Sequence, residues 1–179
     1  TTPTVDGNRV YFLGSYLMLT CIDAATGKLI WQHDLVKEFN GRVIKWKNAV
    51  SPILDGGLIY AIGGGSGQSL LAFNKTDGKL VWKGQDDTPT HASPVPVTIH
   101  DVRQVIFFTQ TGLVSVGATT GQVLWRYGFP FVTSTASSPV VWQDMVYCSA
   151  GYGVGGAAVR IQKAAAGFEA RELWRDKSV

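Results

Sequence analysis

The residue types that most often carry acid–base chemistry or bind metals are sparse in this sequence of 179 residues. Its three histidines, His33, His91 and His100, are far apart and lack the spacing of a metal-binding set. A Ser, His and Asp arrangement for nucleophilic catalysis cannot be argued from spacing, because every member would come from a distant segment. The sequence therefore predicts neither a catalytic residue nor a metal ligand.

Two further patterns suggest ligand chemistry but are better explained as turns. Asp6, Asp55 and Asp144 could offer hard oxygen ligands to calcium, but calcium needs several carboxylates together, and each of these lies in a predicted hairpin turn. Residues 63–67 read Gly-Gly-Gly-Ser-Gly and could present backbone amides to a phosphate. They lack the Gly-Lys-Ser/Thr ending and the following helix of a phosphate-binding loop, so we expect a hairpin tip.

The candidate binding residues lie in the connections that lead into predicted first strands, because loops on a rigid β scaffold commonly carry binding function. Trp46 stands between two lysines and could stack on or dock to a partner. The alternative is that Trp46 and Phe131 fill the inner layer of the fold or cover sheet edges, and that His91 is an ordinary exposed loop residue. The candidate set is Arg42, Lys45, Trp46, Lys47, Asn48, His91, Phe129, Phe131 and Thr133.

These connections separate copies of a repeat. Tryptophans at positions 31, 82, 125 and 174 are spaced by 51, 43 and 49 residues, and a Thr/Ser-Pro pair recurs in phase with them at 2–3, 51–52, 93–94 and 138–139. Periods of this length are typical of propellers and solenoids. We expect a single segment, 1–179, with repeats at approximately 1–36, 48–86, 91–128 and 136–176.

Each repeat divides into strand-like pieces joined by turn residues. The second repeat predicts strands at 51–54, 58–62, 69–74 and 79–83, and the third predicts strands at 104–109, 112–117 and 122–127. A lone four-stranded meander cannot bury both of its faces, so successive meanders must pack face to face. The predicted fold is therefore all-β, a β-propeller segment of four blades, each a four-stranded antiparallel meander, with almost no helix.

Each repeat ends in a turn followed by tryptophan. Asp23 and Asn74 are expected to hydrogen-bond back to the turn backbone, with Gly27 and Gly78 taking positive φ, and the tryptophans are expected to pack between blades. The fourth copy inserts three residues after its glycine. The repeat residues are Asp23, Gly27, Trp31, Asn74, Gly78, Trp82, Gly121, Trp125, Gly167 and Trp174.

The segments 21–31 and 72–82 resemble the tryptophan-docking repeat of the pyrroloquinoline-quinone-like (quinoprotein-like) β-propellers. The start of the chain and residues 151–156 look most like bacterial secreted members of unassigned role. The resemblance implies an eight-bladed ring, of which four blades would be half, and a periplasmic or extracellular location. The family also includes quinone-dependent dehydrogenases and a propeller of outer-membrane assembly.

A dehydrogenase of that family would be expected to hold pyrroloquinoline quinone and calcium over the ring axis, often beside a disulfide between adjacent cysteines. This sequence has two separated cysteines, Cys21 and Cys148, which we expect to be buried free thiols. No calcium-binding set can be matched to it residue by residue. No cofactor is evident, and quinone and calcium enter only under the dehydrogenase alternative.

Composition narrows the function classes. The 45% hydrophobic and 16% charged content is that of a folded protein, and the net charge of +3 is spread along the chain, which gives no support to nucleic-acid binding. The sequence shows no transmembrane run, signal peptide or initiator Met, and we expect a piece of a longer protein.

The leading functional hypothesis is non-catalytic binding of a protein or small ligand through axial loops. The alternatives are a quinone- and calcium-dependent alcohol or sugar dehydrogenase and a scaffold for assembly at a membrane. The remaining blades or a second copy are expected to cover the exposed blade ends.

Overall fold

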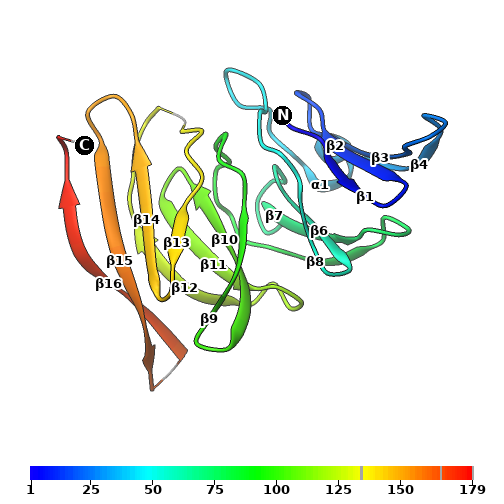
Figure 1. Cartoon of the computed structure of the whole chain (residues 1–179). Coiled ribbons are helices and arrows are strands. Elements are labelled where there is room, and N and C mark those ends of the chain that lie inside the picture. Colours follow the sequence, from blue (N-terminus) through cyan, green and yellow to red (C-terminus); the bar gives the residue numbers. More distant parts are fainter. Residues whose placement is uncertain (134, 166, 179) are drawn as a thin grey trace. The chain divides into compact units, whose positions relative to one another are not determined.

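The computed structural model describes residues 1–133, 135–165 and 167–178, which form four antiparallel sheets (Figure 1). Each sheet has four strands, paired in chain order. The first two sheets comprise β1 (Thr4–Asp6), β2 (Arg9–Leu13), β3 (Met18–Asp23), β4 (Leu29–Asp34), β5 (Ile53–Asp55), β6 (Leu58–Ile62), β7 (Leu70–Asn74) and β8 (Leu80–Gly84). The other two comprise β9 (Val95–Ile99), β10 (Val102–Thr109), β11 (Gly112–Gly117), β12 (Val123–Gly128), β13 (Val140–Trp142), β14 (Met145–Ala150), β15 (Gly155–Ala164) and β16 (Gly167–Asp176). The predicted all-β class with four meander blades is confirmed.

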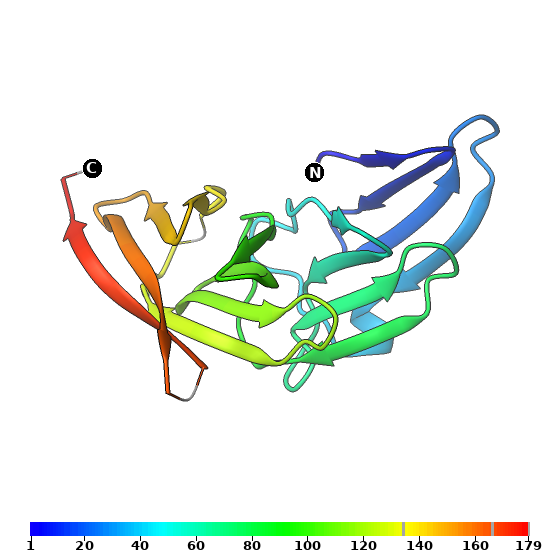
Figure 2. The same cartoon turned by 60° about the horizontal axis from the view of Figure 1, so that its bottom comes forward.

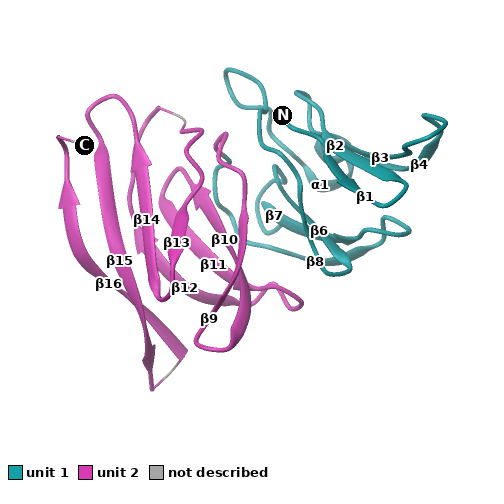
Figure 3. Cartoon of the chain, in the orientation of Figure 1, with its two compact units in different colours: residues 1–89 teal, residues 90–179 magenta. Residues whose placement is uncertain are grey.

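The chain divides into two compact units, Thr1–Pro89 and Thr90–Val179 (Figure 3). The first unit contains the sheets β1–β4 and β5–β8 together with the helix α1 (Leu35–Phe39). The second unit contains the sheets β9–β12 and β13–β16. Each unit thus consists of two four-stranded meanders.

The predicted strands of the second and third repeats lie close to the observed ones, with differences at their ends. The predicted strand 51–54 begins later, at Ile53, because Pro52 has no N–H for the sheet. The same placement recurs at Pro3, Pro94 and Pro139, each directly before a first strand. The predicted strand 104–109 begins earlier, at Val102, because His100 and Asp101 both have positive φ and close a two-residue hairpin.

Every sheet has a β-bulge next to the residue that pairs with its last-strand tryptophan. The pairs are Cys21↔Trp31, Ala72↔Trp82, Ser115↔Trp125 and Ala158↔Trp174, and the register shifts directly after each. A bulge bends its strand and increases the local twist. The bulge that recurs in each repeat therefore sets the direction in which the tryptophan side chain projects from its sheet.

In the first unit, the buried side chains of both sheets form one cluster that includes Tyr11, Trp31, Ile59 and Phe73. The helix α1 contributes to this cluster through Leu35 and Phe39. Asp34 begins the helix, since its carboxylate accepts hydrogen bonds from the backbone N–H groups of residues 36 and 37. The helix is short, in keeping with the expectation of almost no helix.

In the second unit, one cluster joins Phe108, Phe129 and Phe131 to Val146 and Val159 of the last sheet. The inserted residues of the fourth repeat lengthen a hairpin, so β15 and β16 each have 10 residues (Figure 2). Gly167 pairs with Ala164 at the far end of this hairpin. It does not occupy the turn position of Gly27, which lies four residues before its tryptophan.

Candidate functional site

The connection 40–48, between α1 and β5, is held at both ends by backbone hydrogen bonds. The N–H of Gly41 donates to the carbonyl of Leu35, and the N–H of Asn48 donates to the carbonyl of Ser15, both at 2.9 Å. Lys47, with φ of 66°, closes a turn onto the carbonyl of Ile44. The charged side chains of this connection are therefore presented from a defined backbone rather than from a free loop.

The glycine-rich segment 63–67 connects β6 to β7, as a hairpin tip should, and it packs backbone to backbone against this connection. A Cβ at Gly41 would lie 2.6 Å from the carbonyl oxygen of Gly63, and a Cβ at Gly65 would lie 2.5 Å from that of Asn40. The N–H of Gly65 donates to the carbonyl of Phe39 at 2.8 Å. Glycine is needed here for close approach of the two chains.

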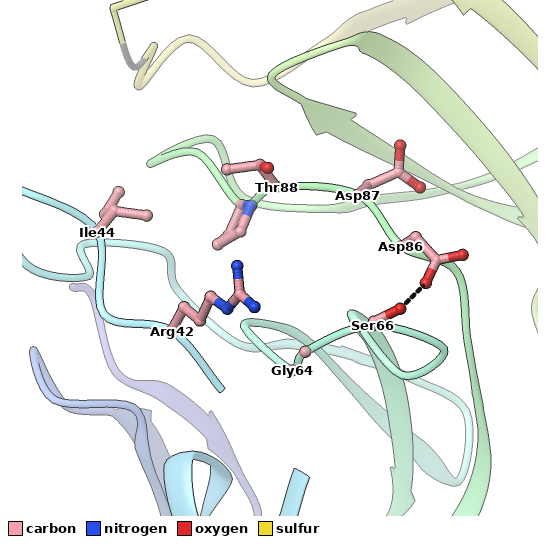
Figure 4. A pocket seen from close by; sticks show the side chains of 9 residues that line it. Arg42, Ile44, Gly64, Ser66, Asp86, Asp87 and Thr88 are labelled. Carbon is pink, nitrogen blue, oxygen red and sulfur yellow. Dashed lines mark hydrogen bonds between the residues drawn. The ribbon is translucent and has the colours of Figure 1, made fainter. Parts of the chain in front are cut away.

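A small pocket lies where this hairpin meets the start of the connection and the segment that follows β8 (Figure 4). It has a volume of about 120 Å³ and is hereafter called the Arg42 pocket. The Arg42 side chain extends into the space between Gly64 and Thr88 (Figure 4). The pocket is lined by Arg42, Ile44, Gly64, Gly65, Ser66, Asp86, Asp87, Thr88 and Pro89.

Two charged side chains of the Arg42 pocket, Asp86 and Arg42, differ in their hydrogen bonding. The Asp86 carboxylate already accepts hydrogen bonds from the Ser66 hydroxyl at 2.5 Å and the Gly67 N–H at 2.6 Å. Within the described parts of the chain, the Arg42 guanidinium has no hydrogen bond or ion pair, so its donors are available to a ligand. A guanidinium binds a carboxylate through two parallel hydrogen bonds. The volume suits one side-chain-sized group and is well below the roughly 300–1,000 Å³ of cofactor and drug sites.

An exposed aromatic–lysine patch is made of Lys45, Trp46 and Lys47 of the same connection together with Tyr16, which lies between β2 and β3. The side chains of Tyr16 and Trp46 are 66% and 58% exposed. The Lys45 ammonium lies 5.2 Å from the centre of the Trp46 ring, and that of Lys47 lies 4.8 Å from the Tyr16 ring. Such cation–π pairs hold the rings and charges together at the surface.

Asn48, the last residue of the connection, is buried, whereas Lys45, Trp46 and Lys47 are exposed. Its side-chain Nδ2 has no hydrogen-bond partner among the residues that the structure describes. A buried amide donor without a partner is unfavourable by about 1–3 kcal/mol. Any acceptor that reaches this nitrogen would relieve that penalty.

The structure thus places Arg42, Lys45, Trp46, Lys47 and Asn48 on one connection of the first unit. Tyr16, Ser66, Asp86 and Thr88 join them from other loops, and the sequence reasoning missed all four. Tyr16 alone had a local signal, as a large aromatic at a Gly-Ser hairpin tip. The others become neighbours only through the packing of the hairpin 63–67.

The remaining candidates belong to the second unit and have different surroundings. The Phe129 and Phe131 rings are buried and pack with Phe108 at centroid distances of 5.9 and 5.4 Å, so they fill the core rather than face a ligand. The His91 side chain is half-buried, and its backbone N–H donates to the Thr135 carbonyl at 2.9 Å. Thr133 is half-buried too.

The possible calcium ligands do not form a set. Asp6 ends β1 and pairs with Lys75 at 2.6 Å, Asp55 ends β5, and Asp144, between β13 and β14, lies 3.5 Å from Arg160. They belong to three different sheets and do not fit one calcium ion. In the described ranges, no three His, Cys, Asp or Glu side chains converge, and no helix could span a membrane.

Both cysteines are buried free thiols. Burial raises the pKa of Cys21, partly opposed by the charge of Arg9, and raises that of Cys148 to about 12, opposed by Arg175. Thiols with raised pKa values are poor nucleophiles at neutral pH. Their surroundings are those of core residues.

Comparison with known proteins supports the fold. A family model described as outer membrane protein assembly factor BamB matches residues 1–178. The crystal structure of BamB from Moraxella catarrhalis is similar over 97% of this chain and 50% of its own, with 15% identity and a TM-score of 0.66. This chain therefore spans half the length of that protein.

Two further solved structures share the architecture. Quinohemoprotein alcohol dehydrogenase from Comamonas testosteroni has 24% identity over 71% of this chain and 20% of its own, with a TM-score of 0.55. The computationally designed protein Ika8 has 13% identity over 96% of this chain and 46% of its own, with a TM-score of 0.57. No curated protein sequence matches the chain.

Proposed function

This chain belongs to the family of the outer membrane protein assembly factor BamB, and from that premise we propose that it is a non-catalytic protein that binds an acidic polypeptide segment. The binding surface is the Arg42 pocket together with the aromatic–lysine patch. The observation that carries the proposal is the pair of exposed rings, Tyr16 and Trp46, each beside a lysine ammonium. Exposed aromatic and cationic side chains of this kind are typical of interface hot spots.

The charge of the connection favours an acidic partner. Residues 40–48 contain three cations, Arg42, Lys45 and Lys47, and no acid. A carboxylate of the partner would pair with Arg42 in the pocket, while apolar side chains would lie on Trp46 and Tyr16. The pocket is too small for a tricyclic quinone but accepts an Asp or Glu side chain.

The spacing suits a short peptide rather than a single small molecule. Arg42 and Trp46 are four residues apart, so at most about 14 Å of backbone separates them. An extended partner segment of about four residues would therefore reach both the pocket and the patch. The proposal includes a role in assembling other proteins, in the periplasm or outside the cell, and the family and this surface support it.

The test uses a fluorescent peptide of alternating Glu and Leu residues and its Gln counterpart as probes, with anisotropy as the measurement. The Glu peptide should bind, more weakly as salt rises, and the Gln peptide should bind at least tenfold less tightly. Trp46→Ala and Lys45→Glu should each weaken binding about tenfold or more. Lys28→Glu makes the same charge change on an exposed lysine of the first unit and should have little effect.

Equal binding of the two peptides, or full binding by Lys45→Glu, would contradict the proposal. The dehydrogenase alternative is tested on the same preparation by adding pyrroloquinoline quinone, calcium and an alcohol or sugar. Sustained dye reduction would overturn the non-catalytic assignment. Photo-crosslinking from position 46 in cells would then identify the natural polypeptide partner, and Arg42→Glu should reduce that crosslink.

A further inference from the structure

His33, near the end of β4, has a hydrogen-bond acceptor at each of its two ring nitrogens. Its Nδ1 lies 2.6 Å from Glu38 Oε2, and its Nε2 lies 2.7 Å from the carbonyl oxygen of Gly78. An ionised carboxylate and a backbone carbonyl can only accept, so both nitrogens must donate for both contacts to be hydrogen bonds. A neutral imidazole has one N–H group and the imidazolium has two. The geometry is therefore that of a protonated histidine.

Aromatic side chains from both sheets and from the helix surround the His33 ring. The ring is stacked on Phe73 of β7, with centroids 4.8 Å apart and planes at 24°. The Phe39 ring of α1 meets it edge-on at 6.1 Å, and the Trp31 ring lies 5.9 Å away. Turning the His33 ring would give up this stack. Its two nitrogens are therefore kept on the same two acceptors.

Glu38 joins His33 to the start of the helix. Its second oxygen, Oε1, accepts a hydrogen bond at 2.8 Å from the backbone N–H of Asp34, the residue that begins α1. The helix has five residues, and a helix this short is not stable by itself. The His33–Glu38 contact thus contributes to holding α1 in place.

The end of α1 sets the position of the peptide site. The N–H of Gly41 donates to the carbonyl of Leu35, and the N–H of Gly65 donates to the carbonyl of Phe39. Arg42 follows directly and lines the pocket together with Gly65. A shift of the helix would therefore reach both the connection that carries Arg42 and the glycine hairpin opposite.

The other charged side chains on the elements around His33 have partners of their own. Hydrogen bonds from the backbone N–H groups of Lys37 and Lys79 lower the pKa values of Asp34 and Asp77, so both stay ionised near neutral pH. Among the described residues, Glu38 is the one charged side chain that contacts the ring nitrogens of His33. The remaining contacts are the ion pairs Lys37–Asp34, Lys79–Asp77 and Lys75–Asp6, Arg9 on the carbonyls of Lys75 and Thr76, and Lys83 over the Phe39 ring.

We propose that the proton on His33 regulates the peptide site, an inference that rests on the proposed binding of an acidic segment. With the proton, His33 holds Glu38 at the start of α1, and the helix holds the connection 40–48 in its binding form. Without the proton, the ring must give up either Glu38 or Gly78. Histidine commonly changes its charge between about pH 5 and pH 8. The acidic segment should therefore bind more tightly at the acid end of this range.

The experiment repeats the anisotropy titration with the Glu–Leu peptide at about pH 6 and about pH 8, at one ionic strength. The peptide is ionised at both, since Glu titrates near about pH 4.3. The wild-type dissociation constant should be about fivefold lower at the acid pH. His33→Gln is neutral throughout, so it should bind equally at both pH values and about as weakly as the wild type at about pH 8.

His100→Gln is the matched control in the second unit. His100 Nε2 also lies on a backbone carbonyl, that of Ile161, at 2.8 Å, and its ring is stacked on Phe168. Its Nδ1 has no hydrogen-bond partner in the parts of the chain that the structure describes. A neutral ring therefore satisfies its surroundings, and this variant should keep the wild-type pH dependence.

Glu38→Gln distinguishes a proton switch from a merely structural contact. The new amide can donate to the Nδ1 of a neutral His33 ring and still accept from the N–H of Asp34. This variant should therefore lose the pH dependence and bind at about pH 8 as tightly as the wild type does at about pH 6. A merely structural role predicts weaker binding at both pH values with the fivefold ratio unchanged, which would overturn the proposal.

Hydrogen exchange gives a readout that does not need the peptide. The protection factors of the Gly41 and Gly65 N–H groups should fall from about pH 6 to about pH 8 in the wild type and His100→Gln, and stay constant in Glu38→Gln. A peptide that binds at neither pH would contradict the proposed function, and the protection factors would then decide the role of His33. Protection and binding that are both independent of pH in the wild type would overturn the proposal.

Discussion

In both units one four-stranded sheet packs on another, but the polar contacts made around the buried tryptophans differ. In the first unit, Trp31 donates to a backbone carbonyl of the neighbouring sheet, in the turn 74–78. In the second unit, Trp125 occupies the same repeat position but donates to Gln104 Oε1 of its own sheet, at 2.7 Å. In the neighbouring sheet, the pairing of β15 with β16 continues to Ala164 and Gly167.

Other side chains make the polar contacts between the sheets of the second unit. The Tyr127 hydroxyl donates to the Glu172 carboxylate, and His100 Nε2 lies 2.8 Å from the carbonyl oxygen of Ile161. In the first unit the comparable histidine contact comes from His33, whose Nε2 lies 2.7 Å from the carbonyl of Gly78. Trp31 and Trp125 are both buried but donate to different acceptors. The common feature is therefore the large apolar area that the tryptophan buries, and the hydrogen-bond acceptor can vary.

The largest test of this difference is Gly78→Ala in the first unit. It forces positive φ on alanine, at about 1–2 kcal/mol, and adds a methyl group against the Trp31 ring, at about 1–3 kcal/mol more. Gly27→Ala has the same backbone strain but open space, so it isolates the clash. Urea unfolding should show the first variant destabilised by about 1–3 kcal/mol more than the second, and equal losses would contradict the docking of Trp31 on this turn.

A smaller difference is expected when each tryptophan is replaced by phenylalanine. Trp125→Phe leaves the fully buried Gln104 amide with one donor fewer, and should be destabilised by about 1 kcal/mol more than Trp31→Phe. Lys75 loses little in the latter variant, because Tyr11 and Arg9 still donate to its carbonyl. Calorimetric or denaturant unfolding measures both, and the reverse order would show that packing outweighs the hydrogen bond.

A further test concerns the buried thiol of the second unit. The pKa of Cys148 is raised from its ordinary value of 9.0 to about 12 by burial. As the pH rises, the thiol ionises in the unfolded chain before it ionises in the folded one. The free energy of unfolding is therefore undiminished below about pH 9 and falls between about pH 9 and 12, by at most about 1.4 kcal/mol per pH unit.

Unfolding experiments at about pH 8 and pH 10 should therefore show a smaller loss for Cys148→Ala than for the wild type. Cys21→Ala provides the comparison in the first unit, where the charge of Arg9 opposes the effect of burial. An identical pH dependence in the wild type and Cys148→Ala would show that the thiol is not the group responsible.

Much of the fold could be predicted because its signals are local. The tryptophan period, the Ser/Thr-Pro pairs and the glycine turns lie within single repeats, and they place the four meanders within a few residues. The Asp23 turn shows how local this is, since its carboxylate accepts from the N–H groups of Ala25 and Thr26. The third repeat forms a similar turn that begins at Gly117, although glycine has no side chain to accept hydrogen bonds from the turn backbone.

The candidate site could be predicted only in part. The binding residues of the connection 40–48 could be predicted because its cations and tryptophan lie close together in the sequence. The roles of Phe129 and Phe131 were not, because an aromatic linker looks the same in sequence whether it covers a core or faces solvent. Their burial depends on Phe108 and on side chains of the last sheet.

The sequence by itself determined the repeat, the strand order and the glycine turn of the first three copies, since these depend on residues close together in the chain. Only the tertiary structure decided which tryptophans are covered: Trp31 lies on a neighbouring turn, while Trp174, at the same repeat position, remains exposed. It also decided that Arg42 meets a glycine hairpin and the segment after β8. The physical reason is that burial and pocket formation depend on what another segment places opposite a residue, which its own neighbours in the chain do not specify.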